Sequence, residues 1–129
     1  MVGMFLSVGA GGAIGAMARY GASVVLAARF GASGWIATLA VNAVGCFLMG
    51  MLAAHLASSA HIPEPLRGFV AVGFLGGLTT FSTFTLDGYG FWLRGDIVGA
   101  VVYIAASILL SLACFAIGFC VLRTGLGTI

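Results

Sequence analysis

The sequence predicts an all-α membrane protein of four transmembrane helices, and two observations lead to this fold class. Hydrophobic residues make up 62% of the 129 residues and charged residues only 6%, whereas soluble domains carry about 25% charged residues. The few charges also divide the chain into apolar stretches, and each is long enough for the roughly 20 residues that cross a bilayer as a helix. We therefore expect one transmembrane domain over residues 1–129, embedded in a lipid bilayer.

The four apolar stretches are the predicted helices, and they cover approximately residues 3–27, 35–57, 66–93 and 97–122. Backbone polar groups in lipid must be satisfied within the protein, which favours helices. Four segments without period-2 alternation do not close a β-barrel. The first stretch has no basic segment before it and is long for the apolar part of a signal peptide. We therefore expect it to be a transmembrane helix and not a cleaved signal peptide.

The three cysteines, Cys46, Cys114 and Cys120, all lie within the predicted helices. An odd number of thiols in membrane-embedded helices argues against a disulfide framework. A free cysteine packs as a small apolar residue, and we interpret all three in this way.

Glycine occurs 21 times and follows a spacing that indicates close helix packing. Gly11 and Gly15 are four residues apart, as are Gly73 and Gly77. Small residues at this spacing share a helix face and let two membrane helices approach closely. The pattern predicts tight helix contacts but says little about function, because many membrane proteins have it.

The arginines give almost no signal for orientation in the membrane. One side, with both ends of the chain and the second loop, carries Arg67 and Arg123, and the other carries Arg29 and Arg94, with Arg19 added if it lies near that end. Cytoplasmic loops normally hold an excess of Lys and Arg. We therefore predict dual topology, with antiparallel pairs as the working unit, against the alternative of one orientation set by other signals.

Polar residues within the second and fourth predicted helices are spaced to share a face. Thr38 and Asn42 lie four residues apart in the second, and Tyr103, Ser107 and Ser111 follow at steps of four in the fourth. A single Ser or Thr usually bonds its own backbone or bridges two helices, whereas an amide is costly to bury unpaired. Together these residues indicate one polar path.

The path lacks the carboxylates that a cation or proton relay generally uses. No Asp or Glu lies near the middle of the first, second or fourth predicted helix, and Asp87 lies towards the end of the third. Phe81 and Phe84 are three residues apart and share a face. Because ring edges carry positive partial charge, two such edges suit a small anion, although packing alone is the alternative role for these rings.

The pair Gly76–Gly77 before Thr79 and Thr80 predicts a break near the middle of the third helix. Irregular backbone at membrane depth is tolerated where it is buried or lines a cavity, and it exposes carbonyls that bind cations. On the two-fold axis of a dimer, such carbonyls converge and suit a hard ion such as sodium. The alternative is a simple kink.

Arg19 follows a long apolar stretch and precedes Tyr20. Its side chain either extends to the membrane interface or faces an aqueous vestibule where it attracts anions. Both interpretations stay open at this stage.

Three segments, residues 11–20, 38–45 and 76–84, resemble the three signatures of the Fluc (CrcB) fluoride channels. The third segment, Gly76-Gly77-Leu78-Thr79-Thr80-Phe81-Ser82-Thr83-Phe84, is highly specific and shows no departure from the family pattern. The resemblance covers essentially the full chain. Asp87 stands where an acidic residue is often found.

The resemblance implies a channel that passively exports fluoride from the cytoplasm across the inner membrane, as an antiparallel homodimer with two pores. It also implies a structural sodium ion at the dimer centre, held by the carbonyls of Gly76 and Thr79. The fluoride pathway is expected to include Asn42, Phe81, Phe84, Ser82, Thr83, Tyr103 and Ser111, with Arg19 in a possible vestibule.

Three other classes of protein are weighed against this expectation. A small multidrug exporter needs a membrane carboxylate in the first helix, which this sequence lacks. A membrane assembly factor needs no polar path, so it tolerates changes at Asn42 or the two phenylalanines. An enzyme needs a nucleophile–base pair, and His55 and His61 lie near the second loop without partners. No nucleic-acid partner is expected.

Overall fold

The computed structural model describes residues 1–58 and 62–125, and its regular structure in these ranges is entirely helical. Four spans are long and apolar enough to cross a membrane: α1 (Val2–Phe30), α2 (Gly34–Ala57), a composite span (Glu64–Leu93) and α6 (Ile97–Gly125). They agree with the four predicted helices to within about three residues at each end. The all-α membrane fold class is thereby confirmed.

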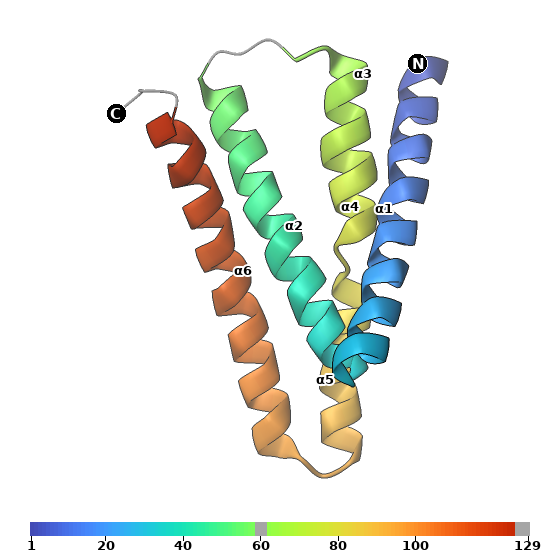
Figure 1. Ribbon diagram of the computed structural model, residues 1–129, viewed down its shortest axis with the longest axis vertical. Helices are drawn as coiled ribbons and strands as arrows, with labels where there is room; N and C mark the ends of the chain where they lie inside the picture. The colour runs from blue at the N-terminus through green and yellow to red at the C-terminus, as the bar shows by residue number, and fades with distance from the viewer. Residues whose placement is uncertain (59–61, 126–129) are drawn as a thin grey trace.

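The composite span consists of four consecutive helical pieces. These are α3 (Glu64–Arg67), the π-helix η1 (Gly68–Leu75), α4 (Gly76–Leu78) and α5 (Phe81–Leu93). Long π-helical runs are rare, and nothing in the sequence analysis pointed to this one. Between α4 and α5 the helix is visibly interrupted by a short extended segment (Figure 1).

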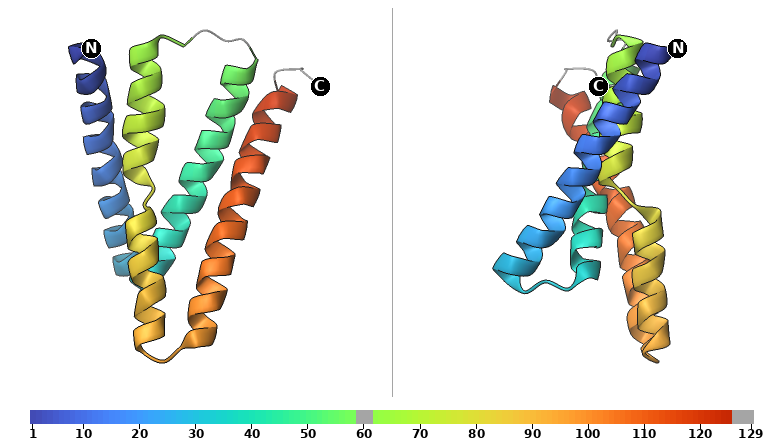
Figure 2. Two further views of the ribbon diagram at one scale, coloured as in Figure 1. Left: turned by 180° about the vertical axis from the view of Figure 1, so that it is seen from behind. Right: turned by 90° about the vertical axis from the view of Figure 1, so that its right-hand side faces the viewer.

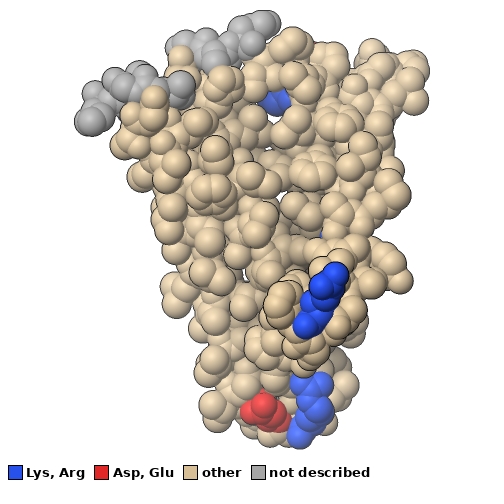
Figure 3. All heavy atoms as spheres, viewed as in Figure 1, with Lys and Arg blue, Asp and Glu red and all other residues tan. Residues whose placement is uncertain are grey.

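The spans run alternately up and down, so that their connections gather at two ends (Figure 1). The starts of α1 and α3 and the ends of α2 and α6 lie at one end, with Arg67 and Arg123. The α1–α2 and α5–α6 connections lie toward the other, with Arg29 and Arg94. Most of the face shown in Figure 3 carries no charge, as expected of a surface in contact with lipid.

Two residues in the left-handed region allow the sharp turns at the second end. Gly31, with φ of 60°, ends α1 and donates its N–H to the Ala27 carbonyl at 3.0 Å. Gly95, with φ of 76°, lies between α5 and α6. Asp96 then accepts a hydrogen bond from the Gly99 N–H at 2.8 Å and caps the start of α6.

α1 packs against η1 and α4 with backbone against backbone, as Figure 2 shows from two sides. A Cβ atom added to Gly11 would collide with the Phe69 carbonyl, and one added to Gly77 would lie 2.6 Å from the Gly12 carbonyl. A Cβ added to Gly15 would meet the Phe74 carbonyl. The predicted tight glycine contacts are therefore confirmed, and they join the first span to the third.

A second glycine contact joins α2 to α6, which run parallel side by side (Figures 1 and 2). A Cβ added to Gly50 would collide with the Phe115 carbonyl, and one added to Gly118 would collide with the Phe47 carbonyl. These glycines are 68 positions apart, which hides the contact from any pattern of neighbouring residues.

The break in the third span is present, and it follows the glycine pair. The adjacent glycines Gly76 and Gly77 lie in helix, and the non-helical residues are Thr79 (φ −82°, ψ 158°) and Thr80 (φ −152°, ψ 124°). The predicted break near the middle of the third helix is therefore confirmed, and its non-helical residues are the two threonines that follow the glycine pair. Gly77 serves to let α4 approach α1, and the chain departs from the helix where α2 offers Thr80 other hydrogen-bond partners.

All three cysteines are free, in agreement with the sequence analysis. Cys46 and Cys114 are half-buried, and Cys120 is exposed. Of the two histidines, His55 is half-buried in the last turn of α2, whereas His61 lies outside the described residues.

Candidate ion pathway at the broken helix

Asn42 of α2 holds both backbone groups of Thr80 at the break. Its Oδ1 accepts a hydrogen bond from the Thr80 N–H at 2.8 Å, and its Nδ2 donates to the Thr80 carbonyl at 3.1 Å. The N–H group, which the break deprives of a helical partner, is thereby satisfied, as membrane burial requires. The half-buried amide fixes the extended backbone relative to α2.

Thr80 also begins α5 as its N-cap residue. Its Oγ1 accepts a hydrogen bond from the Thr83 N–H at 3.2 Å, which is the usual role of an N-cap hydroxyl. The same hydroxyl donates to Thr83 Oγ1 at 3.1 Å and lies 3.2 Å from Ser82 Oγ. Three hydroxyls therefore cluster at the amino-terminal end of α5, where the helix dipole favours negative charge.

The carbonyls of Gly76 and Thr79 lose their helical donors at the break. In a continuous α-helix the Thr80 N–H would donate to the Gly76 carbonyl and the Thr83 N–H to the Thr79 carbonyl. Here these N–H groups donate to Asn42 Oδ1 and to Thr80 Oγ1. Since hard cations take oxygen ligands, the residues at the break fit the sodium site that the resemblance implies.

Gly45 leaves room for the side chain of Thr79. A Cβ at Gly45 would collide with Cγ2 of Thr79, whose hydroxyl donates to the Leu75 carbonyl at 2.9 Å. The spacing of Asn42 and Gly45 on α2 therefore has a physical basis, because the first binds the break and the second accommodates it.

A cavity of about 340 Å³ lies beside the break, between α2, α5 and α6. Ser107 on its wall is only 5% exposed, and its side chain interacts with that of Tyr103, one turn earlier on α6. The lining residues are Asn42, Cys46, Thr79, Thr80, Phe81, Phe84, Ser107, Ile108, Ser111 and Leu112.

Phe81 and Phe84 lie side by side on this cavity, with ring centroids 5.3 Å apart and planes at 41°. Phe81 is 78% exposed, so its ring borders the cavity from the outside of the single chain. Phe84 packs in turn on Tyr103 at 5.6 Å. Tyr103 is buried, and its hydroxyl donates to Asp87 Oδ2 at 3.3 Å, behind the phenylalanine pair rather than on the cavity wall.

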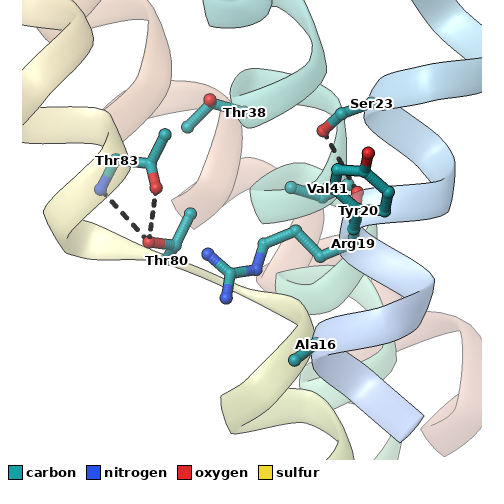
Figure 4. A pocket seen from close by; sticks show the side chains of 8 residues that line it. All are labelled: Ala16, Arg19, Tyr20, Ser23, Thr38, Val41, Thr80 and Thr83. Carbon is teal, nitrogen blue, oxygen red and sulfur yellow. Dashed lines mark hydrogen bonds between the residues drawn. The ribbon is translucent and has the colours of Figure 1, made fainter. Parts of the chain in front are cut away.

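A second cavity, of about 260 Å³, lies on the other side of the break, between α1, α2 and α5. Arg19 reaches across it from α1 toward Thr80 and Thr83 (Figure 4). The Arg19 Nε is buried without a hydrogen-bond partner among the described residues. The other lining residues are Ala16, Tyr20, Ser23, Thr38 and Val41. Thr80 lines both cavities, so the break lies between them.

The structure thus gathers most of the predicted pathway residues at one place. Asn42, Phe81, Phe84 and Ser111 line the first cavity, and Thr83 and Arg19 line the second. Ser82 is exposed beside Thr80, and Tyr103 lies behind Phe84. Thr38 and Ser107, which the sequence analysis placed on the polar path, line the second and the first cavity, whereas Thr80, which lines both, was missing from the predicted pathway.

These features define a small multi-pass membrane protein with a polar path beside a broken helix, which is the architecture of a channel or small transporter. The model of the family described as "CrcB-like protein, Camphor Resistance (CrcB)" matches residues 6–119. The chain belongs to this family, which confirms the resemblance found in its motifs.

Curated relatives support the assignment over nearly the whole chain. A protein of Paracoccus denitrificans is 45% identical over 119 residues, which are 92% of this chain and 94% of the relative. One of Rhodospirillum centenum is 45% identical over 124 residues, 94% and 96% of the two chains. Both are named fluoride-specific ion channel FluC. They are channels and not enzymes, as the sequence analysis expected for this chain.

Proposed function

We propose that this chain is a fluoride-selective channel that passively exports fluoride from the cytoplasm across the inner membrane and so lowers its toxicity. The observation that carries the proposal is the cavity at the break, where an amide, hydroxyl groups and two phenylalanine rings meet without a carboxylate. The names of the CrcB relatives supply the identity of the ion.

The cavity offers the groups that a partly dehydrated anion needs. Ser107 and Ser111 are hydroxyl donors on one wall, and Phe81 and Phe84 present two rings on another. Ring edges carry positive partial charge but hold no formal charge, so an anion is stabilised without being trapped. Conduction requires this balance between entering and leaving a site.

Arg19 and the start of α5 give the second cavity the character of an anion vestibule. The guanidinium lies beside Thr80 and Thr83, at the amino-terminal end of the helix. Positive charge at the mouth of a narrow path concentrates anions locally. We assign Arg19 to this vestibule and not to the membrane interface.

An antiparallel homodimer with two pores is the working assembly in this proposal. Phe81 and Gly76 are exposed on the single chain, although both belong to the region of the break. With Arg19 drawn into the second cavity, the two ends of the molecule carry Arg67 and Arg123 against Arg29 and Arg94. This even balance supports insertion in both orientations.

A structural, non-transported sodium ion at the dimer centre completes the proposal. The carbonyls of Gly76 and Thr79, freed from their helical donors, would hold it together with the same pair from the second subunit. When bound, the ion would supply positive charge between the carbonyls of the two breaks.

The first experiment is anion efflux from liposomes that contain the purified protein, measured with a fluoride electrode beside a chloride control. We expect rapid fluoride efflux without chloride efflux. No fluoride efflux from a folded dimer prepared in sodium would overturn the proposed function.

Two further measurements address the assembly. Reporter fusions at the carboxyl terminus are expected to label both sides of the membrane, and labelling on one side only would exclude dual topology. Complete replacement of sodium by a large organic cation is expected to abolish conduction, and unchanged conduction would remove sodium from the proposal.

A further inference from the structure

Two of the three cysteines lie on turns of α2 and α6 that come shortly before the glycine contact between these helices. Gly50 contacts the backbone of Phe115, and Gly118 contacts the backbone of Phe47, so these turns of the two helices touch. Cys46 lies four residues before Gly50, and Cys114 lies four residues before Gly118. Residues four apart share a helix face, and α2 and α6 run parallel.

We infer that the two cysteines lie one helical turn before the glycine contact, on the helix faces that meet there. Both cysteines are half-buried and free. Cys120, six residues after Cys114, is exposed and provides a natural comparison.

One member of the pair lies on the wall of the first cavity. Cys46 lines it, together with Asn42 one turn earlier on α2. Cys114 comes three residues after Ser111 and seven after Ser107, both of which line the cavity, so it continues their face.

We propose that Cys46 and Cys114 form a binding site for soft, thiophilic metal ions, and that an ion bound there blocks the pathway. Soft thiolate ligands select soft ions, and two thiolates are sufficient for an ion that prefers linear coordination, such as the mercuric ion. Each thiol releases its proton to solvent when its sulfur binds the metal, and no electrons are transferred. The block rests on the proposed channel function, whereas the metal site does not.

The metal site is tested on the purified protein in detergent by titration with mercuric ion, followed by thiolate-to-metal charge-transfer absorption. We expect one tightly bound ion per chain. Because the second thiolate binds intramolecularly, Cys46→Ser and Cys114→Ser should each weaken binding by about a hundredfold or more. Cys120→Ser is the matched control and should bind as the wild type does. Equal affinity of both single variants and the wild type would overturn the site.

The block is tested by fluoride efflux from liposomes in the presence of mercuric ion. Wild type and Cys120→Ser should be blocked and should recover with excess dithiothreitol, whereas the efflux rate of the double variant Cys46→Ser/Cys114→Ser should be the same with and without mercuric ion. Metal binding without block would overturn the placement of the pair on the pathway. If the untreated wild type passes no fluoride, the channel function fails, and the absorption titration still decides the metal site.

Discussion

Before the break, the third span packs against α1 with backbone against backbone; after it, α5 packs against α6 through aromatic side chains. In the first half, Gly73 and Gly77 leave no space between the helices. In the second, Phe84 and Phe91 surround Tyr103 at 5.6 and 5.7 Å, and cavities open on either side of the first turn of α5. One continuous stretch of sequence therefore forms two different kinds of contact.

The difference shows how a small membrane protein separates rigidity from permeability. Lipid offers no hydrophobic driving force between helices, so close packing of small residues supplies the stability. The glycine contacts fix η1 and α4, and Asn42 fixes the next residues from the other side. The start of α5 is then free to present hydroxyls and rings to a cavity instead of to a packed core.

The largest effect is expected from Gly15→Ala, which alters the contact between α1 and the rigid half of the third span, before the break. The new methyl group would press on the backbone of Phe74 and Leu78, which cannot turn away. Overpacking costs about 1–3 kcal/mol even where side chains adjust, so the Tm should fall by about 10 °C or more. Gly9→Ala, with open space around it, is the matched control. Equal melting of both variants would show that this contact does not hold the fold.

Asn42→Ala alters the break between the two halves of the third span. It removes both hydrogen bonds to Thr80, and each group left unsatisfied costs about 1–3 kcal/mol. We expect fluoride efflux to fall by about a hundredfold, the equivalent of 2.7 kcal/mol, with a lower Tm.

Asn42→Asp separates the two consequences of that change. The carboxylate still accepts from the Thr80 N–H, so more of the stability should remain than in the alanine variant. Its negative charge should still prevent anion passage. Normal fluoride efflux in the aspartate variant would exclude Asn42 from the pathway.

The double variant Phe81→Ile/Phe84→Ile alters only the permeable half. Ring contacts contribute about 0.5–1.5 kcal/mol beyond their buried area, so the folded protein should be retained while fluoride efflux falls by about tenfold. Efflux and size-exclusion chromatography of the same preparation measure both. Undiminished efflux would favour a structural role for the rings. It would also support the alternative that the protein is a membrane assembly factor.

Arg19→Gln should have a smaller effect, because it removes charge from the vestibule and leaves the path intact. Fluoride efflux is expected to fall severalfold at low ionic strength and to approach that of the wild type at about 1 M salt, where the screening length is about 3 Å. A loss of efflux that does not depend on salt would contradict the electrostatic role.

Thr85→Ala is expected to change least. The Thr85 hydroxyl is exposed and donates to the Phe81 carbonyl one turn earlier, at 2.9 Å. Surface substitutions of this kind usually change stability by less than about 0.5 kcal/mol. Efflux clearly below that of the wild type would place a further hydroxyl on the pathway and extend the permeable half along α5.

The sequence by itself determined the class of fold, because the length of an apolar run and the need to satisfy backbone groups in lipid are local requirements. It also determined that Phe81 and Phe84 share a face and that Asn42 shares the polar face of its helix with Thr38, since the spacing carries this information. The glycines of the first and third spans were predicted to make close contacts for the same reason.

Only the tertiary structure decided where the third span breaks and which groups meet there. The break at Thr79 and Thr80 depends on an amide 38 positions away, and the crossing of Gly50 and Gly118 joins residues even farther apart. The side chain of Arg19 had two possible environments until α2 and α5 were placed around it. Local spacing fixes which face of a helix a residue occupies, whereas the partner of that face is a property of the assembled helices.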